Sequence, residues 1–297
     1  MVWFRRIFYF LITNIAFVFI LSITAFVLSK TFGINIYDNN VSSIMIYSLI
    51  IGFTGSFISL LLSKKMAMFT TKTQLITVPS THHEHLIYST IAQLSEKAGI
   101  KMPDVGIYEN DSPNAFATGY SKNSSLVSVS TGLLYCMDDD EIKGVLAHEM
   151  AHIINGDMIT LTLIQGVVNT FVIALSRVLT NLITAWDERI GAIMGMVIYL
   201  LLQIGLGFLG SLIVSYFSRL REYRADEGSV FLMNDKKYMI KALQKLENFQ
   251  NNENMKEGDL ILNSKGLNAF GINGFQNIIT LFSTHPKLSD RIKNLNK

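Results

Sequence analysis

Long runs of apolar residues without a single charge constrain this chain more than any other feature. Ile7–Leu28, Val41–Leu62 and Gly191–Phe217 contain no charged residue. About 20 such residues are enough to cross a bilayer as a helix. Only 16% of all residues are charged, whereas soluble domains have about a quarter. The sequence therefore predicts a membrane protein.

A fourth apolar run completes a pair in the middle of the chain. Met158–Ser176 is uncharged and is followed, after Arg177 and a polar turn near Asp187, by Gly191–Phe217. We interpret residues 158–217 as a hairpin of two transmembrane helices. The alternative is that one or both are buried core helices, and their length argues against it.

The remaining residues predict one soluble domain that the hairpin interrupts. Residues 1–65 hold the first two spans, and residues 66–157 and 218–297 form the domain. Apolar residues recur at helical spacing over residues 79–100. Three short extended runs bounded by turn residues follow: Val105–Tyr108, Asn114–Ala117 and Ser125–Ser130. The predicted fold is a mainly α membrane protein with four hydrophobic segments, a helical soluble domain and a small antiparallel β-sheet.

Basic residues predict how the chain lies across the membrane. Lysine and arginine collect on the cytoplasmic side of membrane proteins. With the N-terminus inside, three basic residues lie outside, Lys30, Arg177 and Arg189. Eight lie inside: Arg5, Arg6, Lys64, Lys65, Lys72, Arg219, Arg221 and Arg224. The soluble domain is therefore expected in the cytoplasm.

The most informative short motif is His148-Glu149-Met150-Ala151-His152. In a helix, residues four apart share a face, so the two imidazoles can meet one metal ion. A glutamate next to the first histidine can handle the proton of a water molecule in such a site. On a helical wheel Glu149 falls among apolar residues, where a carboxylate is costly without a partner. A catalytic metal site supplies that partner.

A catalytic zinc site needs a third protein ligand. An antiparallel hairpin returns its two ends to the same membrane face, which brings Glu222 towards His148 and His152. Asp226 lies one helical turn further on and could accept a hydrogen bond from a ligand histidine. The alternative is that Glu222 and Asp226 only pair with neighbouring arginines on a solvated helix.

These motifs, in this order, resemble the HtpX family of bacterial, membrane-bound, zinc-dependent heat-shock endopeptidases. The residues concerned are HEMAH, EYRAD from Glu222 to Asp226, NAFATG from Asn114, STGLL from Ser130 and THP from Thr284. The resemblance covers nearly the whole chain, and the family is related to the CAAX prenyl protease.

The resemblance implies roles for individual residues. His148, His152 and Glu222 would bind one Zn²⁺ per chain, and Glu149 would act as general acid and base. Asp226 would support a ligand histidine, His148. Five further residues are implied around the substrate. His285 and Arg291 would stabilise the oxyanion, while Asn114, Ala115 and Phe116 would lie on the edge strand that receives the substrate backbone.

The predicted function is zinc-dependent hydrolysis of peptide bonds in misfolded membrane proteins or unfolded polypeptides, as part of a stress response. The expected location is the bacterial cytoplasmic membrane, with functional overlap with other membrane quality-control proteases. A net charge of +2 without a basic stripe gives no sign of a nucleic-acid partner. Two alternatives remain open, a prenyl-protein processing protease and a non-catalytic membrane chaperone.

Overall fold

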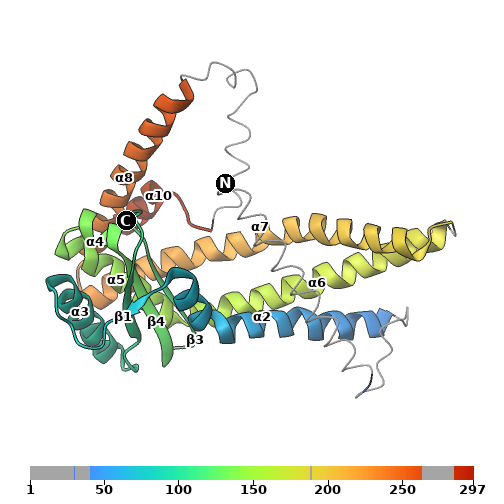
Figure 1. Cartoon of the computed structure of the whole chain (residues 1–297), viewed down its shortest axis with the longest axis horizontal. Coiled ribbons are helices and arrows are strands. Elements are labelled where there is room, and N and C mark those ends of the chain that lie inside the picture. The colour runs from blue at the N-terminus through green and yellow to red at the C-terminus, as the bar shows by residue number, and fades with distance from the viewer. Residues whose placement is uncertain (1–29, 31–40, 188, 263–283) are drawn as a thin grey trace. The chain divides into compact units, whose positions relative to one another are not determined.

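The computed structural model describes residues 30, 41–187, 189–262 and 284–297 (Figure 1). Most of these residues are helical. The helices are α2 (Val41–Thr71), α3 (His82–Ala98), α4 (Thr131–Cys136), α5 (Asp139–Asn155), α6 (Asp157–Trp186), α7 (Ala192–Met233), α8 (Lys237–Leu262) and α10 (Leu288–Leu295). The strands are β1 (Gln74–Leu75), β2 (Asp104–Tyr108), β3 (Ala115–Ser121) and β4 (Ser124–Ser130).

Three helices in the described part of the chain are long and apolar enough to cross a membrane. They are Ser43–Thr71, Asp157–Trp186 and Ala192–Met233, and they include the second, third and fourth predicted hydrophobic segments. The first predicted segment, Ile7–Leu28, lies outside the described residues. Helices α6 and α7 pack closely against each other as a hairpin. Gly210 of α7 lies so near Val168 of α6 that an added Cβ atom would be only 2.7 Å from the Val168 side chain.

The helix α7 does not end where its apolar run ends. It continues for 42 residues from Ala192 to Met233 and includes the Glu222–Asp226 motif. Glu222 therefore lies on the same continuous helix as the last apolar segment.

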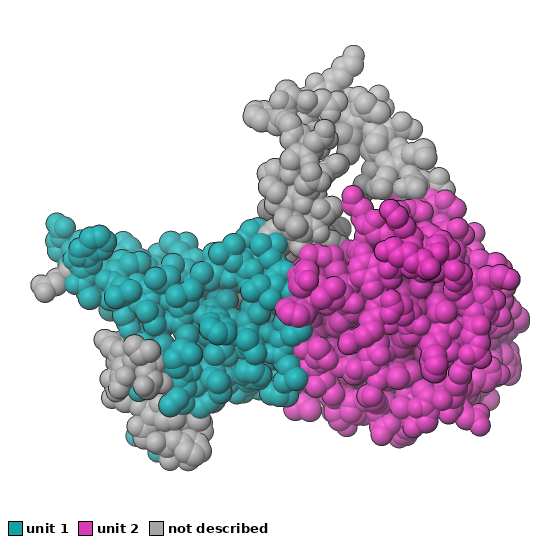
Figure 2. Space-filling view, turned by 180° about the vertical axis from the view of Figure 1, so that it is seen from behind, with its two compact units in different colours: residues 1–59, 162–214 teal, residues 60–161, 215–297 magenta. Residues whose placement is uncertain are grey.

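The chain divides into two compact units (Figure 2). The first contains α2 up to Ser59 and residues Thr162–Val214. The second contains Leu60–Leu161 and Ser215–Lys297, and with them the sheet, α5 and every residue of the candidate site. The boundaries at residues 65, 157 and 217 were predicted between membrane spans and the soluble domain, not between compact units. They stay a prediction.

Capping residues determine where the motif helix α5 begins and ends. The Asp138 side chain accepts a hydrogen bond from the Glu141 backbone N–H at 2.8 Å, and the Glu141 carboxylate accepts one from the Asp138 N–H at 2.9 Å. This reciprocal pair caps the first turn. The helix ends at Gly156, whose φ of 70° favours glycine.

The core of the second unit is built on the apolar face of α5. Ile142, Leu146, Met150 and Ile153 are all fully buried, and they pack with residues of α3, β2 and β4. Helix α8 crosses α5 with the two backbones almost in contact at Gly144. A side chain would not fit there, because an added Cβ atom would lie only 2.4 Å from the Tyr238 carbonyl oxygen. The motif helix is therefore held between other elements over most of its length.

The sheet is mixed, which corrects the predicted antiparallel sheet. Its strand order is β1-β2-β4-β3. β4 pairs antiparallel with β3 but parallel with β2, and β1 pairs antiparallel with β2. The chain reverses once between β2 and β3 and again between β3 and β4, so β4 runs in the direction of β2. In the sheet β4 lies between β2 and β3, so it pairs with β2 in parallel. β3 is left at the edge of the sheet.

Candidate metal centre

Helix α5 presents both histidines of the motif to one point. The His148 and His152 Nε2 atoms lie 3.2 Å apart, and the two rings meet edge to face with centroids 4.7 Å apart. His148 is buried, at 6% exposure, and His152 and Glu149 are half-buried. The helical spacing of four residues accounts for this convergence.

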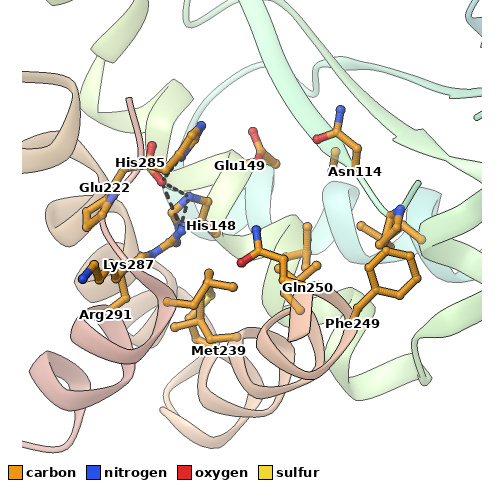
Figure 3. A pocket seen from close by; sticks show the side chains of 18 of the residues that line it. Asn114, His148, Glu149, Glu222, Met239, Phe249, Gln250, His285, Lys287 and Arg291 are labelled. Atoms are coloured by element: carbon orange, nitrogen blue, oxygen red, sulfur yellow. Dashed lines mark hydrogen bonds and ion pairs between the residues drawn. The ribbon is translucent and has the colours of Figure 1, made fainter. Parts of the chain in front are cut away.

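Glu222 of α7 reaches the same point. Its Oε2 lies 3.5 Å from His148 Nε2 (Figure 3). Its Oε1 lies 3.4 Å from His152 Nε2. Among the described residues, these three form a group whose donor atoms all lie within 4.8 Å of one another. Donors around a tetrahedral zinc ion with bonds of about 2.0–2.1 Å lie about 3.3 Å apart. The donor set and its spacing therefore fit zinc.

Each histidine has a carboxylate on its other ring nitrogen. His148 Nδ1 lies 3.0 Å from Asp226 Oδ1, and Asp226 is fully buried on α7. His152 Nδ1 lies 2.7 Å from Asp157 Oδ2, at the first residue of α6. The sequence predicted Asp226 as a partner of a ligand histidine, but Asp157 was missed. An acid five residues after His152, directly before an uncharged run, was the signal that could have identified it.

The hydrogen bonds to carboxylates dominate the electrostatics of both rings. Burial by itself lowers the pKa of His148, but hydrogen bonds with Asp226 and Glu222 raise it above its ordinary value. Burial by itself lowers the pKa of His152 as well, but hydrogen bonds with Asp157 and Glu222 raise this pKa to about 9. The centre therefore attracts cations, and a divalent metal ion competes with protons for the same nitrogens.

Arg291 and His285 contact this centre from the C-terminal segment. Arg291 of α10 is buried and donates to both Asp226 oxygens, from Nε at 2.8 Å and from Nη2 at 2.6 Å, and its Nη1 lies 3.3 Å from Glu222 Oε2. The guanidinium therefore faces two carboxylates, and the oxyanion role that the resemblance implies for Arg291 stays a prediction. His285 is exposed, and its Nδ1 lies 2.9 Å from Glu222 Oε2.

A cavity of about 780 Å³ opens beside these residues. It is lined by His148, Glu149, Glu222, His285 and Arg291 on the polar side. Its apolar lining includes Leu133, Val145, Met239, Leu243, Leu246 and Phe249. In the view of Figure 3, Glu149 lies between the donor cluster and Asn114. The cavity is therefore open to Glu149 and to two of the three donors, His148 and Glu222.

The predicted substrate strand only partly lines the cavity. Asn114 and Ala115 line it, whereas the Phe116 ring lies 5.6 Å from the ring of Tyr108. The Asn114 side chain donates a hydrogen bond to the Tyr108 hydroxyl at 2.8 Å, so Tyr108 fixes its orientation. The sequence analysis did not identify this role of Tyr108. Within the described residues β3 pairs only with β4, so its other edge is unpaired beside the cavity.

Comparisons with known proteins identify the family to which the chain is similar. Residues 81–297 match the profile of peptidase family M48. The chain is 45% identical over 303 residues to a protein named Protease HtpX homolog from Methylacidiphilum infernorum, with 99% of both chains covered. It is 44% identical over 298 residues to Protease HtpX from Shewanella oneidensis, with 98% of this chain and 99% of the relative covered.

A solved structure shows the same fold at much lower sequence identity. The crystal structure of S. mikatae Ste24p superposes with a TM-score of 0.57 and 18% sequence identity, over 96% of this chain. This chain spans 65% of the length of that protein. The likeness therefore concerns the fold.

Proposed function

The chain belongs to peptidase family M48 and is a membrane-bound metalloprotease; from this premise we propose that its metal is zinc, one ion per chain, held by His148, His152 and Glu222. The observation that carries this proposal is the spacing of 3.2–3.5 Å between the three donor groups. The same three residues are the ligands that the family resemblance implies.

Glu149 is the proposed acid and base of the reaction. A zinc ion bound by the three donors would polarise the scissile carbonyl and make a water molecule more acidic. The Glu149 carboxylate lines the cavity beside the donors. It would accept a proton from the attacking water and pass it to the leaving amine.

The two residues from the C-terminal segment are assigned different roles. His285 is exposed at the edge of the cavity and would donate a hydrogen bond to the oxyanion. Arg291 is buried, and its guanidinium would hold Asp226, which in turn orients His148. We therefore assign Arg291 to the support of the metal centre.

The cavity supports an extended polypeptide as substrate. The unpaired edge of β3 can add a strand by backbone hydrogen bonds, and the apolar lining can accept apolar side chains, which unfolded proteins expose. Together with relatives named Protease HtpX, this supports misfolded membrane proteins as the substrate class, in a stress response shared with other membrane proteases.

The proposed location is the bacterial cytoplasmic membrane with the site facing the cytoplasm. Two arguments support it, the excess of basic residues on that side and the continuous helix α7, which carries both an apolar segment and Glu222.

Proteolysis by the purified full-length protein in detergent tests the function. An unfolded model membrane protein and a farnesylated peptide serve as substrates, each with zinc and with a chelator. Glu149→Gln should remove cleavage and Glu227→Gln, an exposed neighbouring acid, should not. Cleavage by Glu149→Gln at the wild-type rate would contradict the mechanism, and cleavage of the farnesylated peptide alone would contradict the substrate class.

A further inference from the structure

The second ligand histidine is held by a residue that no sequence motif assigned. We propose that Asp157 is the positioning residue for His152 and that Arg224 holds Asp157 in place. The inference rests on the proposed function, because it concerns how tightly the same centre binds zinc.

The hydrogen bond determines which nitrogen of His152 is available. His152 Nε2 faces His148 and Glu222, whereas Nδ1 lies 2.7 Å from Asp157 Oδ2. A carboxylate accepts a hydrogen bond only from a protonated nitrogen. Asp157 therefore keeps the proton on Nδ1 and leaves the Nε2 lone pair free for a metal ion, and it also fixes the plane of the ring.

The turn between α5 and α6 brings Asp157 back over His152. Gly156 has φ of 70° and separates the last residue of α5 from Asp157, the first residue of α6. Its backbone N–H donates to the carbonyls of His152 and Ile153. Asp157 is only 1% exposed, so its carboxylate is fixed in the protein interior and cannot turn away into solvent.

A buried carboxylate needs partners, and α7 supplies them. Arg224 Nη2 lies 2.5 Å from Asp157 Oδ1, and Arg221 Nη1 donates to the Asp157 backbone carbonyl at 3.0 Å. These two arginines flank Glu222 in the sequence. The network therefore joins α5, α6 and α7 at the point where α5 and α7 present the three donors.

The same arrangement occurs twice in the centre. His148 is held by Asp226, which is held by Arg291; His152 is held by Asp157, which is held by Arg224. If the ion pair between Asp157 and Arg224 served only to join helices, Asp157 would not need a hydrogen bond with a ligand histidine. Because Asp157 uses one oxygen for Arg224 and the other for His152, the geometry assigns it to the metal centre.

The test measures zinc affinity in the full-length protein in detergent. All variants carry Glu149→Gln, which prevents self-cleavage. Asp157→Asn keeps the size of the side chain but removes its charge. Loss of such a partner lowers metal affinity by about 10–100-fold, so competition with a chromophoric chelator should show a loss of that size. The visible spectrum of the Co²⁺ protein should change as well, because the ring is less firmly oriented.

Asp104→Asn is the matched control. Asp104 also forms an ion pair, 2.6 Å from Lys64, but it contacts no proposed ligand, so zinc affinity should not change. Arg224→Gln is the second variant. It keeps the hydrogen bond between Asp157 and His152 and should cause a smaller but measurable loss of affinity.

The outcomes separate this inference from the proposed function. If the Glu149→Gln parent binds no zinc, the proposed function fails. If the parent binds zinc and Asp157→Asn binds it within twofold as tightly, the inference is overturned. Should Asp157→Asn not fold, Arg224→Gln decides, since unchanged zinc affinity and an unchanged Co²⁺ spectrum in that variant would overturn the inference.

Discussion

Replacing Arg291 by methionine tests how the metal centre is stabilised. The guanidinium makes two hydrogen bonds to Asp226 and an ion pair with Glu222, which are 0% and 2% exposed. Methionine has a similar length but no charge, so both buried carboxylates lose a cation. Removing one partner of a buried ion pair costs about 3–5 kcal/mol.

This free energy corresponds to a large shift in melting temperature. For a domain of about 150–250 residues, one kcal/mol shifts the midpoint by roughly 2–4 °C. Arg291→Met should therefore lower the melting temperature of the metal-free protein by about 6–20 °C. The loss should be smaller with zinc, because bound zinc compensates the charge of Glu222.

The single cysteine provides the assay. Cys136 is half-buried, and burial raises the pKa of its thiol, which slows reaction in the folded protein because the thiolate is the reactive form. A thiol-reactive fluorescent dye therefore reports unfolding of the protein in detergent during heating. Lys293→Met, an exposed cation on the same helix, is the control and should melt with the wild-type protein.

Two results would refute this reasoning about Arg291. A melting temperature within about 2 °C of the wild type would show that the two carboxylates do not need the guanidinium. A normal melting temperature combined with a large loss of peptide hydrolysis would favour the oxyanion role that the sequence predicted.

Three further predictions concern the proposed catalytic glutamate, the proposed third ligand and the protons of the candidate centre. Glu149→Gln should bind zinc normally but hydrolyse peptides about 10²–10⁴-fold more slowly, as measured by zinc content and by initial rates; loss of zinc would instead place Glu149 among the ligands. Glu222→Gln should remove the charged third donor and lower zinc content after dialysis, whereas retention of one zinc per chain would contradict the ligand set. In the presence of a chelator, melting temperature should fall as the pH rises from about 6.5 to about 9. The pKa of His152 is raised from 6.5 to about 9 in the folded state, so its stabilising contribution is complete below pH 6.5 and is lost as the pH passes through the folded value. A melting temperature that rises over this range would contradict the assignment of the shifted group.

Local signals in the sequence predicted the motif helix well. Asp138 and Glu141 have the spacing of a capping box and form one, and Ile142, Leu146, Met150 and Ile153 recur at helical spacing and are buried. Helix caps and apolar faces depend on residues within one or two turns of each other. Such features can therefore be predicted from a single sequence.

Strand pairing needed information that is not local. The alternation in Ser125–Ser130 predicts a strand, but it does not say which neighbour lies on each side. β4 received the parallel partner β2 because the chain reverses twice between them. The turn residues at Lys122 and Asn123 fixed only the antiparallel hairpin with β3.

The site residues differ in how far the sequence could place them. Helical spacing alone predicts that His148 and His152 point to one place, and the hairpin topology predicts that Glu222 lies near them. In the structure the Glu222 carboxylate lies 3.4–3.5 Å from their Nε2 atoms. Asp157 was missed because aspartate after asparagine and glycine reads as an ordinary helix end. Its contacts with His152 and Arg224 depend on how three helices pack, which no local pattern records.

The ion pair between Asp157 and Arg224 has a consequence for how this protein could be altered. Asp157 lies before the apolar hairpin in the sequence and Arg224 lies after it, so their ion pair joins the two ends of the hairpin directly. The length of the hairpin is then open to change by protein engineering. We expect that lengthening both of its arms by one helical turn would leave zinc stoichiometry unchanged, and loss of zinc in that variant would show that the hairpin itself sets the donor spacing.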